Sequence, residues 1–419
     1  TLKLKHFFAP ELKKTGIESL FFDIEMPLIY VLAEMEYTGV TVDTVALKQS
    51  SEELTATLKK LEKEIYELAG KKFNINSARQ VGEILFVHLK LEEKAKKTRT
   101  GSYSTSEDIL EKMRSKHPVV GKLLEYRGLK KLLSTYIDAL PELINPKTGK
   151  IHTSYNQAVT STGRLSSTNP NLQNIPVRME LGREIRKLFV PREGCVLVDA
   201  DYSQIELRVL AHMSNDKNLI QAYRQAEDIH AITASQVFHV PLEEVTPQLR
   251  RNAKAVNFGI VYGISAFGLG EDLGISRKEA TEYIERYFET YPDVKRFLDG
   301  LVKTGRKYGE VKTMYGRVRP IPELKSGNFM QRSFGERVAM NSPIQGTAAD
   351  IIKIAMIRVD QRLRREGLRS RIVLQVHDEL LIETHLDEFE EVKEILQNEM
   401  MNAVSLRVPL NIDIEQGAS

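Results

Sequence analysis

The 419-residue sequence has a single cysteine, Cys195. One cysteine excludes an intrachain disulfide and a cysteine-based zinc cluster, and it fits a reducing compartment. Cys195 lies in an apolar run, so we expect it in the core. No uninterrupted apolar run approaches the roughly 20 residues that span a bilayer, and the first residues lack the apolar region of a signal peptide. We therefore expect a soluble protein.

The sequence also has little excess charge and no repeat of fixed period. Sixty basic and 57 acidic residues leave a net charge of +3, so nucleic-acid binding would have to show in local charge. A phosphate loop of the type G-x-x-x-x-G-K-[S/T] is absent, and the glycines in residues 268–274 have the wrong spacing for a dinucleotide fingerprint. Side chains and metal would therefore have to hold any triphosphate.

Two acidic stretches stand out against this background. In residues 196–208 a short apolar run ends at Asp201 and a helix-like pattern follows. In residues 372–382 two apolar halves flank a polar trio, which predicts a tight hairpin; the trio is His377, Asp378 and Glu379. Two divalent ions held by Asp201 and Asp378 would polarise the attacking and the leaving oxygen of an in-line phosphoryl transfer. Taken singly, however, an Asp at a strand end is more often a cap or a turn residue.

Apolar spacing predicts helices around and between these stretches. The expected helical segments are residues 19–35, 45–68, 77–89, 119–143, 334–365 and 383–403. Residues 218–315 are expected to be almost all helical, with breaks at Pro241, Pro247, Gly263, Gly274 and Pro292. Residues 45–68 should form one long amphipathic helix that is capped near Asp43 and ends at Gly70. A last strand is expected at residues 407–414.

Residues 90–131 contain twelve basic and six acidic residues, which gives a local net charge of +6. The basic tip of this segment is Lys94, Lys96, Lys97 and Arg99, and hydroxyl residues follow it. A charge run is usually a solvated face. Small hydroxyl residues beside phosphate-seeking lysines instead favour contact with nucleic acid.

Residues 160–174 form a polar, turn-rich run that is rich in amides. Its guanidinium and amide groups can donate to sugar, phosphate and minor-groove acceptors. They belong to Arg164, Asn171, Gln173 and Asn174. The alternative is an ordered surface loop.

A helix at residues 248–262 would carry a stripe of functional side chains. Two cations and two aromatic residues recur every four positions: Arg250, Lys254, Phe258 and Tyr262. The opposite side has the apolar Ala253, Val256 and Ile260 to bury. The stripe could neutralise a polyphosphate and offer flat faces to a base, or it could be a surface face. His230 could add a phosphate donor, although a lone histidine is more often structural.

Three of these stretches resemble the polymerase motifs of family A DNA polymerases. They are Asp-Tyr-Ser-Gln-Ile-Glu-Leu-Arg at 201–208, the helix with its motif at 250–263, and Val-His-Asp-Glu at 376–379. Residues 162–167, 170–174 and 337–350 match further stretches of the family, and the resemblance covers essentially all of residues 20–415.

The resemblance implies an α+β right-hand fold with an antiparallel-sheet palm, a helical thumb and helical fingers. The implied ranges are a palm lead-in at 1–44, a thumb at 45–145, palm at 146–215, fingers at 216–330 and palm again at 331–419. The implied partners are primer-template DNA and deoxynucleoside triphosphates (dNTPs), with no membrane. A monomer that is cytoplasmic and associated with the nucleoid is expected.

The resemblance also implies residue roles. Two divalent cations, Mg²⁺ by expectation, would be held by Asp201, Asp378 and the backbone carbonyl of Tyr202, with Glu379 in an auxiliary role. The triphosphate contacts would be Arg250, Lys254, which also counts as catalytic, and His230. Glu206 would crowd the sugar 2′ position against Tyr262 and so favour deoxynucleotides. Phe258 would discriminate against dideoxynucleotides, and Gln204 would also lie at the nucleotide. The implied DNA contacts near the growing end are Arg164, Arg337, Gln345 and His377, and those elsewhere are Asn171, Gln173, Asn174, Lys96 and Lys97.

Asp23 and Glu25 superficially resemble the first acidic motif of a proofreading exonuclease. No Tyr is followed four positions later by Asp, as the last exonuclease motif requires. We therefore interpret both as helix-face charges and expect polymerisation without proofreading.

Three other classes of protein stay open. A single-subunit RNA polymerase would share the right hand, but Glu206 and the His-Asp-Glu trio argue against it. A non-catalytic DNA clamp would leave the paired acidic sites without a use. A two-metal nuclease would leave the helical stripe unexplained.

Overall fold

The computed structural model describes residues 2–93, 95–99, 101–175, 180–225 and 228–419. Lys94 of the basic tip lies outside the described residues. The chain divides into two compact units. The sheet unit comprises residues 1–39, 153–173 and 191–418, and the helical unit comprises residues 40–152 and 174–190. Each is described by itself.

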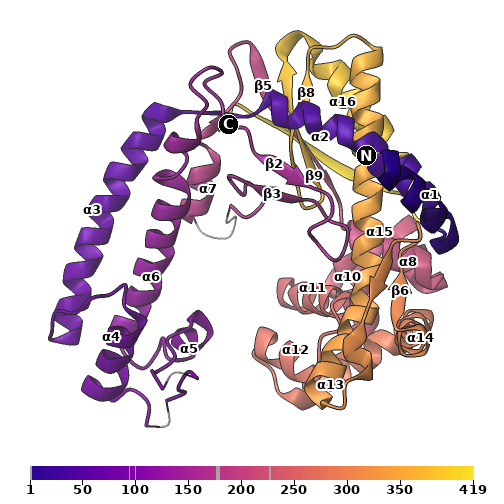
Figure 1. Ribbon diagram of the computed structural model, residues 1–419. Coiled ribbons are helices and arrows are strands. Elements are labelled where there is room, and N and C mark those ends of the chain that lie inside the picture. The colour runs from indigo at the N-terminus through magenta and orange to yellow at the C-terminus, as the bar shows by residue number, and fades with distance from the viewer. Residues whose placement is uncertain (1, 94, 100, 176–179, 226–227) are drawn as a thin grey trace. The chain divides into compact units, whose positions relative to one another are not determined.

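In the helical unit, α3 (Thr44–Ala69) packs against α6 (Pro118–Leu132) (Figure 1). Asp43 begins α3 by accepting the N–H groups of Val45 at 3.0 Å and Ala46 at 2.9 Å. Gly70 ends it in the left-handed conformation with φ 66°, which a residue without Cβ adopts readily. The predicted cap and end of this helix are confirmed.

The other expected helices of this unit are broken. The one at 77–89 is α4 (Ala78–Gly82) followed by the π-helix η2 (Glu83–His88). The one at 119–143 is α6 followed by the π-helix η3 (Leu133–Ile137) and the 3₁₀ turn η4 (Pro141–Leu143). Two short helices were not predicted: α5 (Glu107–Lys112) and α7 (Glu180–Arg186). The short strands β1 (Thr41–Val42) and β4 (Phe189–Val190) pair antiparallel.

The sheet unit is built on a four-stranded antiparallel sheet of order β10–β5–β9–β8. Its strands are β5 (Cys195–Tyr202), β8 (Arg371–Val376), β9 (Glu379–His385) and β10 (Ile412–Gly417). The predicted hairpin is confirmed as β8 and β9, but Glu379 already belongs to β9 and only two residues form the turn. Cys195 is buried, as expected.

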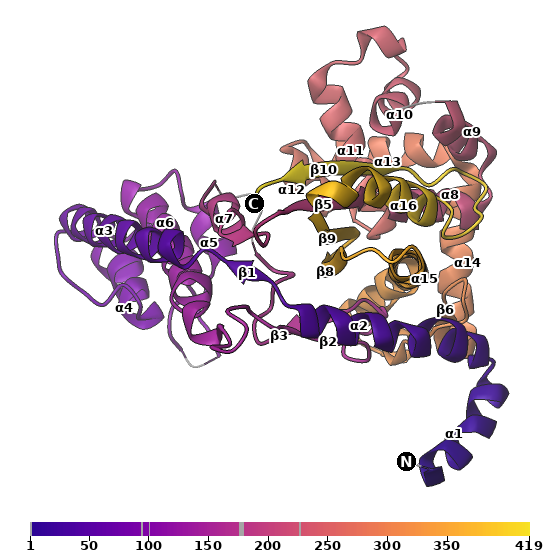
Figure 2. The ribbon, with the colours of Figure 1, turned by 90° about the horizontal axis from the view of Figure 1, so that it is seen from above.

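Helices cover this sheet and form the rest of the unit. The central helix α15 (Phe329–Arg365) contacts α8 (Ile205–Ser214), α2 (Met26–Thr38) and β8, and α16 (Phe389–Met401) contacts β9 and β10 (Figure 2). The remaining helices are α1 (Leu2–Thr15), the π-helix η1 (Leu20–Glu25), α9 (Lys217–Gln225), α10 (Ile229–Phe238), α11 (Pro247–Val261), α12 (Ala266–Leu273), α13 (Arg277–Thr290) and α14 (Pro292–Tyr308), with 3₁₀ turns η5 (Leu242–Glu244), η6 (Pro322–Lys325) and η7 (Leu386–Glu388).

Two short hairpins complete the sheet unit. Strands β2 (Ser154–Asn156) and β3 (Ser166–Thr168) pair with each other, as do β6 (Glu310–Lys312) and β7 (Val318–Pro320). The polar run at 160–174, expected as a loop or an amide-rich contact segment, therefore contains a strand.

Some boundaries and one interpretation were wrong. The helix expected at 383–403 begins only at Phe389, because Glu383 and Thr384 are buried in β9. The last strand starts at Ile412 and not at Arg407, since the intervening Pro409 has no N–H to donate. Glu25, expected as a helix-face charge, is a partner in a buried ion-pair network.

No helix in the described part of the chain has both the length and the apolar character needed to cross a membrane.

Candidate functional site

The two acidic stretches meet in the four-stranded sheet. Asp201 lies near the end of β5, and its register partner on β9 is Glu379. Beside it, the backbone N–H of Tyr202 donates to the carbonyl oxygen of Asp378 at 3.2 Å. On the other edge of β5, Asp413 of β10 is the register partner of Asp201. Strand pairing thus brings together residues that are roughly 180 to 210 positions apart.

The carboxylates in this cluster repel one another. Burial, followed by the charges of Asp378, Asp199 and Asp413, raises the pKa of Asp201 to about 7. Burial also raises the pKa of Asp378, against the opposing effect of Arg164. The Oδ1 atom of Asp201 is buried and has no hydrogen-bond partner among the described residues. A buried carboxylate oxygen without a partner is costly, and a hard divalent cation with oxygen ligands would relieve both problems.

The donor set therefore fits a divalent cation, although it is small. No group of three or more His, Cys, Asp or Glu side chains in the described ranges has the arrangement of a metal site. Two carboxylates would need backbone, phosphate or water oxygens to complete a shell. Tyr202, the predicted backbone ligand, is held firmly, because its ring is buried and its hydroxyl donates to the Met400 carbonyl at 2.6 Å.

Sequence reasoning missed two members of this cluster. Asp199 and Asp201 lie two positions apart on one strand and so share a face, a signal that was present in the sequence. Asp413 belongs to the cluster only through the pairing of β10 with β5, which no local pattern reveals.

Glu206, Arg164 and Tyr262 form a second group. Glu206 lies in the first turn of α8 with 7% of its surface exposed, and its carboxylate forms an ion pair with Arg164. Burial raises the pKa of Glu206, and the charge of Arg164 opposes that rise. Burial, and then the charge of Glu206, raises the pKa of Tyr262 to about 12. The structure thus brings together the two residues that the resemblance assigns to the sugar, and it adds Arg164 to them.

Two residues beside these groups have an unusual backbone. Gln204, just before α8, has φ 56°, and His377, in the β8–β9 turn, has φ 53°. Left-handed conformations cost a residue with a Cβ roughly 1–2 kcal/mol, and such strain often accumulates at functional sites. The side-chain oxygen of Gln204 accepts a hydrogen bond from Tyr223 at 3.3 Å.

The predicted stripe lies on the outer side of α11. Arg250 and Lys254 are exposed, whereas Ala253, Val256 and Ile260 on the other side are buried. The Arg250 guanidinium pairs with Asp228 at 2.6 Å, and Lys254 Nζ lies 6.0 Å from the centre of the Phe258 ring. Helix α11 therefore has the cationic outer side and the apolar inner side that the sequence predicted. Arg250 already has an anionic partner.

His230 is behind this stripe and is 2% exposed. It lies in the first turn of α10, which Asp228 caps by accepting the N–H groups of His230 and Ala231 at 3.1 Å each. Its ring centre is 5.7 Å from that of Phe258. His230 thus lies behind the stripe, next to the Phe258 ring.

Apart from Arg164, the predicted DNA contacts of the sheet unit lie in two places. The Gln173 side chain donates to the carbonyl and to the side-chain oxygen of Gln375, each at 3.1 Å, and Gln375 donates to the His377 carbonyl at 2.6 Å. Gln375 was not predicted. Asn171 accepts the backbone N–H of Gln173 at 3.0 Å, which is a turn function. The other two contacts lie on α15, where Arg337 is exposed and Gln345 is partly buried.

The helical unit holds the other predicted contacts. Lys96 and Lys97 are exposed, and Lys97 Nζ is 5.2 Å from the Tyr103 ring. Asn174 accepts a hydrogen bond from Tyr136 through its carbonyl at 2.8 Å.

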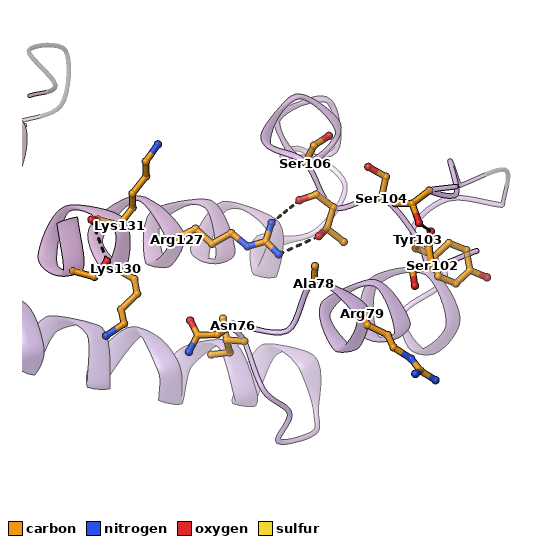
Figure 3. Close-up of a pocket in the computed structure, with 14 residues that line it drawn as sticks. Asn76, Ala78, Arg79, Ser102, Tyr103, Ser104, Ser106, Arg127, Lys130 and Lys131 are labelled. Carbon is orange, nitrogen blue, oxygen red and sulfur yellow. Dashed lines mark hydrogen bonds between the residues drawn. The ribbon is translucent and has the colours of Figure 1, made fainter. Parts of the chain in front are cut away.

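Close to the basic tip is a cavity of about 790 Å³ that is rich in hydroxyl and cationic side chains. Figure 3 shows Arg127 reaching from α6 towards the segment before Ser106. Its guanidinium donates to the Thr105 carbonyl at 2.5 Å and to the Thr105 hydroxyl at 3.1 Å. The polar lining also includes Asn76, Arg79, Lys130 and Lys131. This surface has the donors that a phosphate backbone would meet.

The fold and this site together define a class of protein. The family model of DNA polymerase family A matches residues 44–419, and the chain belongs to that family. It is 54% identical over 408 residues to DNA polymerase I of Geobacillus stearothermophilus, covering 97% of this chain and 46% of that protein. It is 52% identical over 417 residues to DNA polymerase I of Bacillus subtilis, covering 99% and 47%. The chain thus spans about half the length of these relatives.

A solved structure shows the same architecture. The POL domain of Pol1 from M. smegmatis, in complex with DNA primer-template and dNTP, matches with a TM-score of 0.94 and 45% identity, over 100% of this chain and 74% of that one. The predicted α+β polymerase fold is confirmed. The boundaries of thumb, fingers and palm, and the roles of single residues, stay predictions.

Proposed function

We propose that this chain extends a DNA primer on a template. The primer 3′ oxygen attacks the α-phosphorus of a dNTP, a new phosphodiester bond forms, and pyrophosphate leaves. The observation that supports this most directly is the pair Asp201 and Asp378, in which Asp201 has a buried carboxylate oxygen without a hydrogen-bond partner among the described residues. This pair lies in the same unit as the cationic stripe of α11. The relatives are named DNA polymerase I, and the solved structure holds primer-template and dNTP.

Asp201 and Asp378, with the Tyr202 carbonyl, would hold two divalent cations, Mg²⁺ by proposal, and Glu379 would support them. Such ions supply charge neutralisation and polarise the reacting oxygens when bound. The acidic cluster itself excludes the substrate's phosphates unless cations are present, so it makes phosphate binding conditional on them.

The remaining residues would hold the substrates. Arg250, Lys254 and His230 would bind the triphosphate. Lys254 is exposed and forms no salt bridge among the described residues, which supports a role at the leaving pyrophosphate. Phe258 and Tyr262 face the base, with Gln204 nearby, and Glu206 excludes a sugar 2′ hydroxyl. For Arg250 to reach a phosphate, its bond to Asp228 has to be exchanged.

The DNA would be held by residues of both units. Arg164, Arg337, Gln345 and His377 contact the primer-template near its growing end, and Asn171, Gln173, Asn174, Lys96 and Lys97 contact it elsewhere. Minor-groove acceptors are nearly the same in all correct pairs, so such contacts sense pair shape without reading sequence.

We further propose the domain ranges of the right hand: thumb at 45–145, fingers at 216–330 and palm in the remainder. The chain would act as a monomer in the bacterial cytoplasm, at the nucleoid, without proofreading. Primer extension with Mg²⁺ and either dNTPs or ribonucleotides tests the function. Extension with dNTPs is expected. Preference for ribonucleotides would favour an RNA polymerase instead.

A further inference from the structure

A buried polar cluster lies between α10 and α11, behind the stripe of α11. Its members are Asn257, His230 and Thr233, which are 1%, 2% and 0% exposed. The side-chain Nδ2 of Asn257 lies 3.0 Å from Nδ1 of His230 and 3.2 Å from the Thr233 hydroxyl oxygen. Asn257 therefore points inward from the helix whose outer side presents the cations.

These contacts fix where the imidazole proton lies. An amide NH₂ group donates two hydrogen bonds and accepts none, so Nδ1 of His230 has to be the acceptor. A neutral imidazole has one N–H, and it is then on Nε2. Within the described residues no hydrogen bond to Nε2 is made, so this N–H has no acceptor there.

We propose that Asn257 is a positioning residue, which holds His230 neutral with its proton on Nε2 so that the ring presents an N–H donor to the nucleotide triphosphate. This rests on the proposed function for the identity of the ligand. The position of the proton does not depend on it.

The surroundings of His230 agree with a neutral ring. The charged groups that face it are Lys254 and Arg250 on α11 and Asp228 at the start of α10. Burial, and then the charge of Lys254, lowers the pKa of His230 to about 4, against the effect of Asp228. An imidazolium would also place a second N–H against the Asn257 amide. The ring therefore keeps one donor and no charge across the pH range in which the enzyme would work.

The proton position can be read directly by long-range ¹H–¹⁵N correlation spectra of the chain labelled with ¹⁵N-histidine, with His230→Gln to assign the resonance. In the unsubstituted chain, Nε2 should be protonated and Nδ1 unprotonated from about pH 6 to pH 8, because the pKa is far below this range. A spectrum with Nδ1 protonated and Nε2 bare overturns the proposal.

The contribution to nucleotide binding is tested with Asn257→Asp, which replaces the donor by an acceptor. Nδ1 should then be protonated, and the ring should present an N–H from Nε2 only as an imidazolium. The KM of Asn257→Asp for dNTP should therefore rise by roughly tenfold between pH 6 and pH 9, the size of one hydrogen bond to a charged group. The KM of the unsubstituted chain should show no such rise over the same pH range, once any pH effect that both proteins share is subtracted. In a His230→Gln background, this added pH dependence should vanish.

Asn252→Asp is the matched control. Asn252 is also buried on α11, at 6% exposure, but its side-chain oxygen accepts from Gln248 at 2.8 Å. It should show no added pH dependence. If Asn257→Asp does not fold, Asn257→Leu serves instead: it removes the donor, and both tautomers of His230 should then be populated.

Each result decides something. An Asn257→Asp enzyme without the new pH dependence, or one that keeps it in the His230→Gln background, overturns the proposal. So does a single Nε2–H tautomer in Asn257→Leu. If the chain does not extend primers at all, the proposed function and the phosphate role fail together, and the spectrum still reports whether Asn257 sets the tautomer.

Discussion

Replacing Glu25 by Ala should destabilise the sheet unit strongly, although Glu25 lies on a short N-terminal helix. Its carboxylate accepts Lys353 Nζ at 2.8 Å and forms an ion pair with Arg317. It also accepts Gln157 Nε2 at 2.7 Å. Burial disfavours its charge, but Lys353 and Arg317 outweigh burial and lower the pKa of Glu25. Four segments of the chain thus meet at one carboxylate.

The magnitude follows from what the substitution leaves behind. Lys353 is 1% exposed, so without Glu25 its ammonium would stay buried, with the attraction of Asp350 opposed by the repulsion of Arg317. Breaking a buried pair by removing one partner costs about 3–5 kcal/mol, and because Glu25 is itself 17% exposed we expect a loss of about 3 kcal/mol, at the lower end of that range. Arg317 loses less, since it keeps Asp350 at 2.6 Å.

The assay is urea unfolding followed by circular dichroism. Asp23→Ala is the matched control: Asp23 lies on the same helix, is exposed, and accepts a hydrogen bond from Ser19, so its loss should cost less than about 1 kcal/mol. Adding Lys353→Met to Glu25→Ala should restore much of the loss, because the uncompensated charge is then gone. Equal costs for Glu25→Ala and Asp23→Ala, or no recovery with Lys353→Met, would refute the reasoning.

Three further predictions concern substrates, pH and salt. Glu206→Ala should relax the rejection of ribonucleotides, measured as the ratio of kcat/KM for dNTP and NTP; unchanged selectivity would refute the sugar role. His230 binds its proton more weakly in the folded chain, with a pKa of about 4 against 6.5, so the free energy of unfolding should fall as pH drops from 6.5 to 4, by roughly 3 kcal/mol in total. His230→Gln should remove this part of the pH dependence, and an equal pH dependence of unfolding in both proteins would contradict it. Replacing Lys96 and Lys97 by Ala should reduce the slope of log K for DNA against log salt by roughly 2, whereas Lys13→Ala with Lys14→Ala should leave it unchanged; equal slopes for both pairs would count against a DNA role for the tip.

Local patterns predicted much of the fold. The long helix α3, with Asp43 at its start and Gly70 at its end, follows from apolar spacing and capping chemistry alone. The hairpin with Asp378 follows from two apolar halves around a polar turn. Both rest on neighbours in the sequence, which is the range over which such rules work.

What the sequence did not predict depends on distant contacts. Asp413 joins Asp201 through strand pairing, and Glu25 becomes interior only because Lys353 and Arg317 reach it from other segments. The link between Asn257 and His230 likewise needs two helices to pack. Register and helix packing are tertiary properties, so no residue near these positions in the sequence signals them.

The partners of the predicted site residues were only partly predicted. Glu206 and Tyr262 are near each other, as the family resemblance implies, but the ion pair of Glu206 with Arg164 and the contact of Gln173 with Gln375 were not foreseen. Such second partners depend on where a side chain lies after folding.

The central claim is that Asp201 and Asp378 together make this chain a DNA polymerase. The most direct test is primer extension in Mg²⁺ with all four dNTPs, for the unsubstituted chain, Asp201→Ala and Asp378→Ala, with DNA binding measured on the same samples. Extension by the unsubstituted chain, its loss in both variants and retained DNA binding are predicted. Substantial extension by either variant would contradict the account.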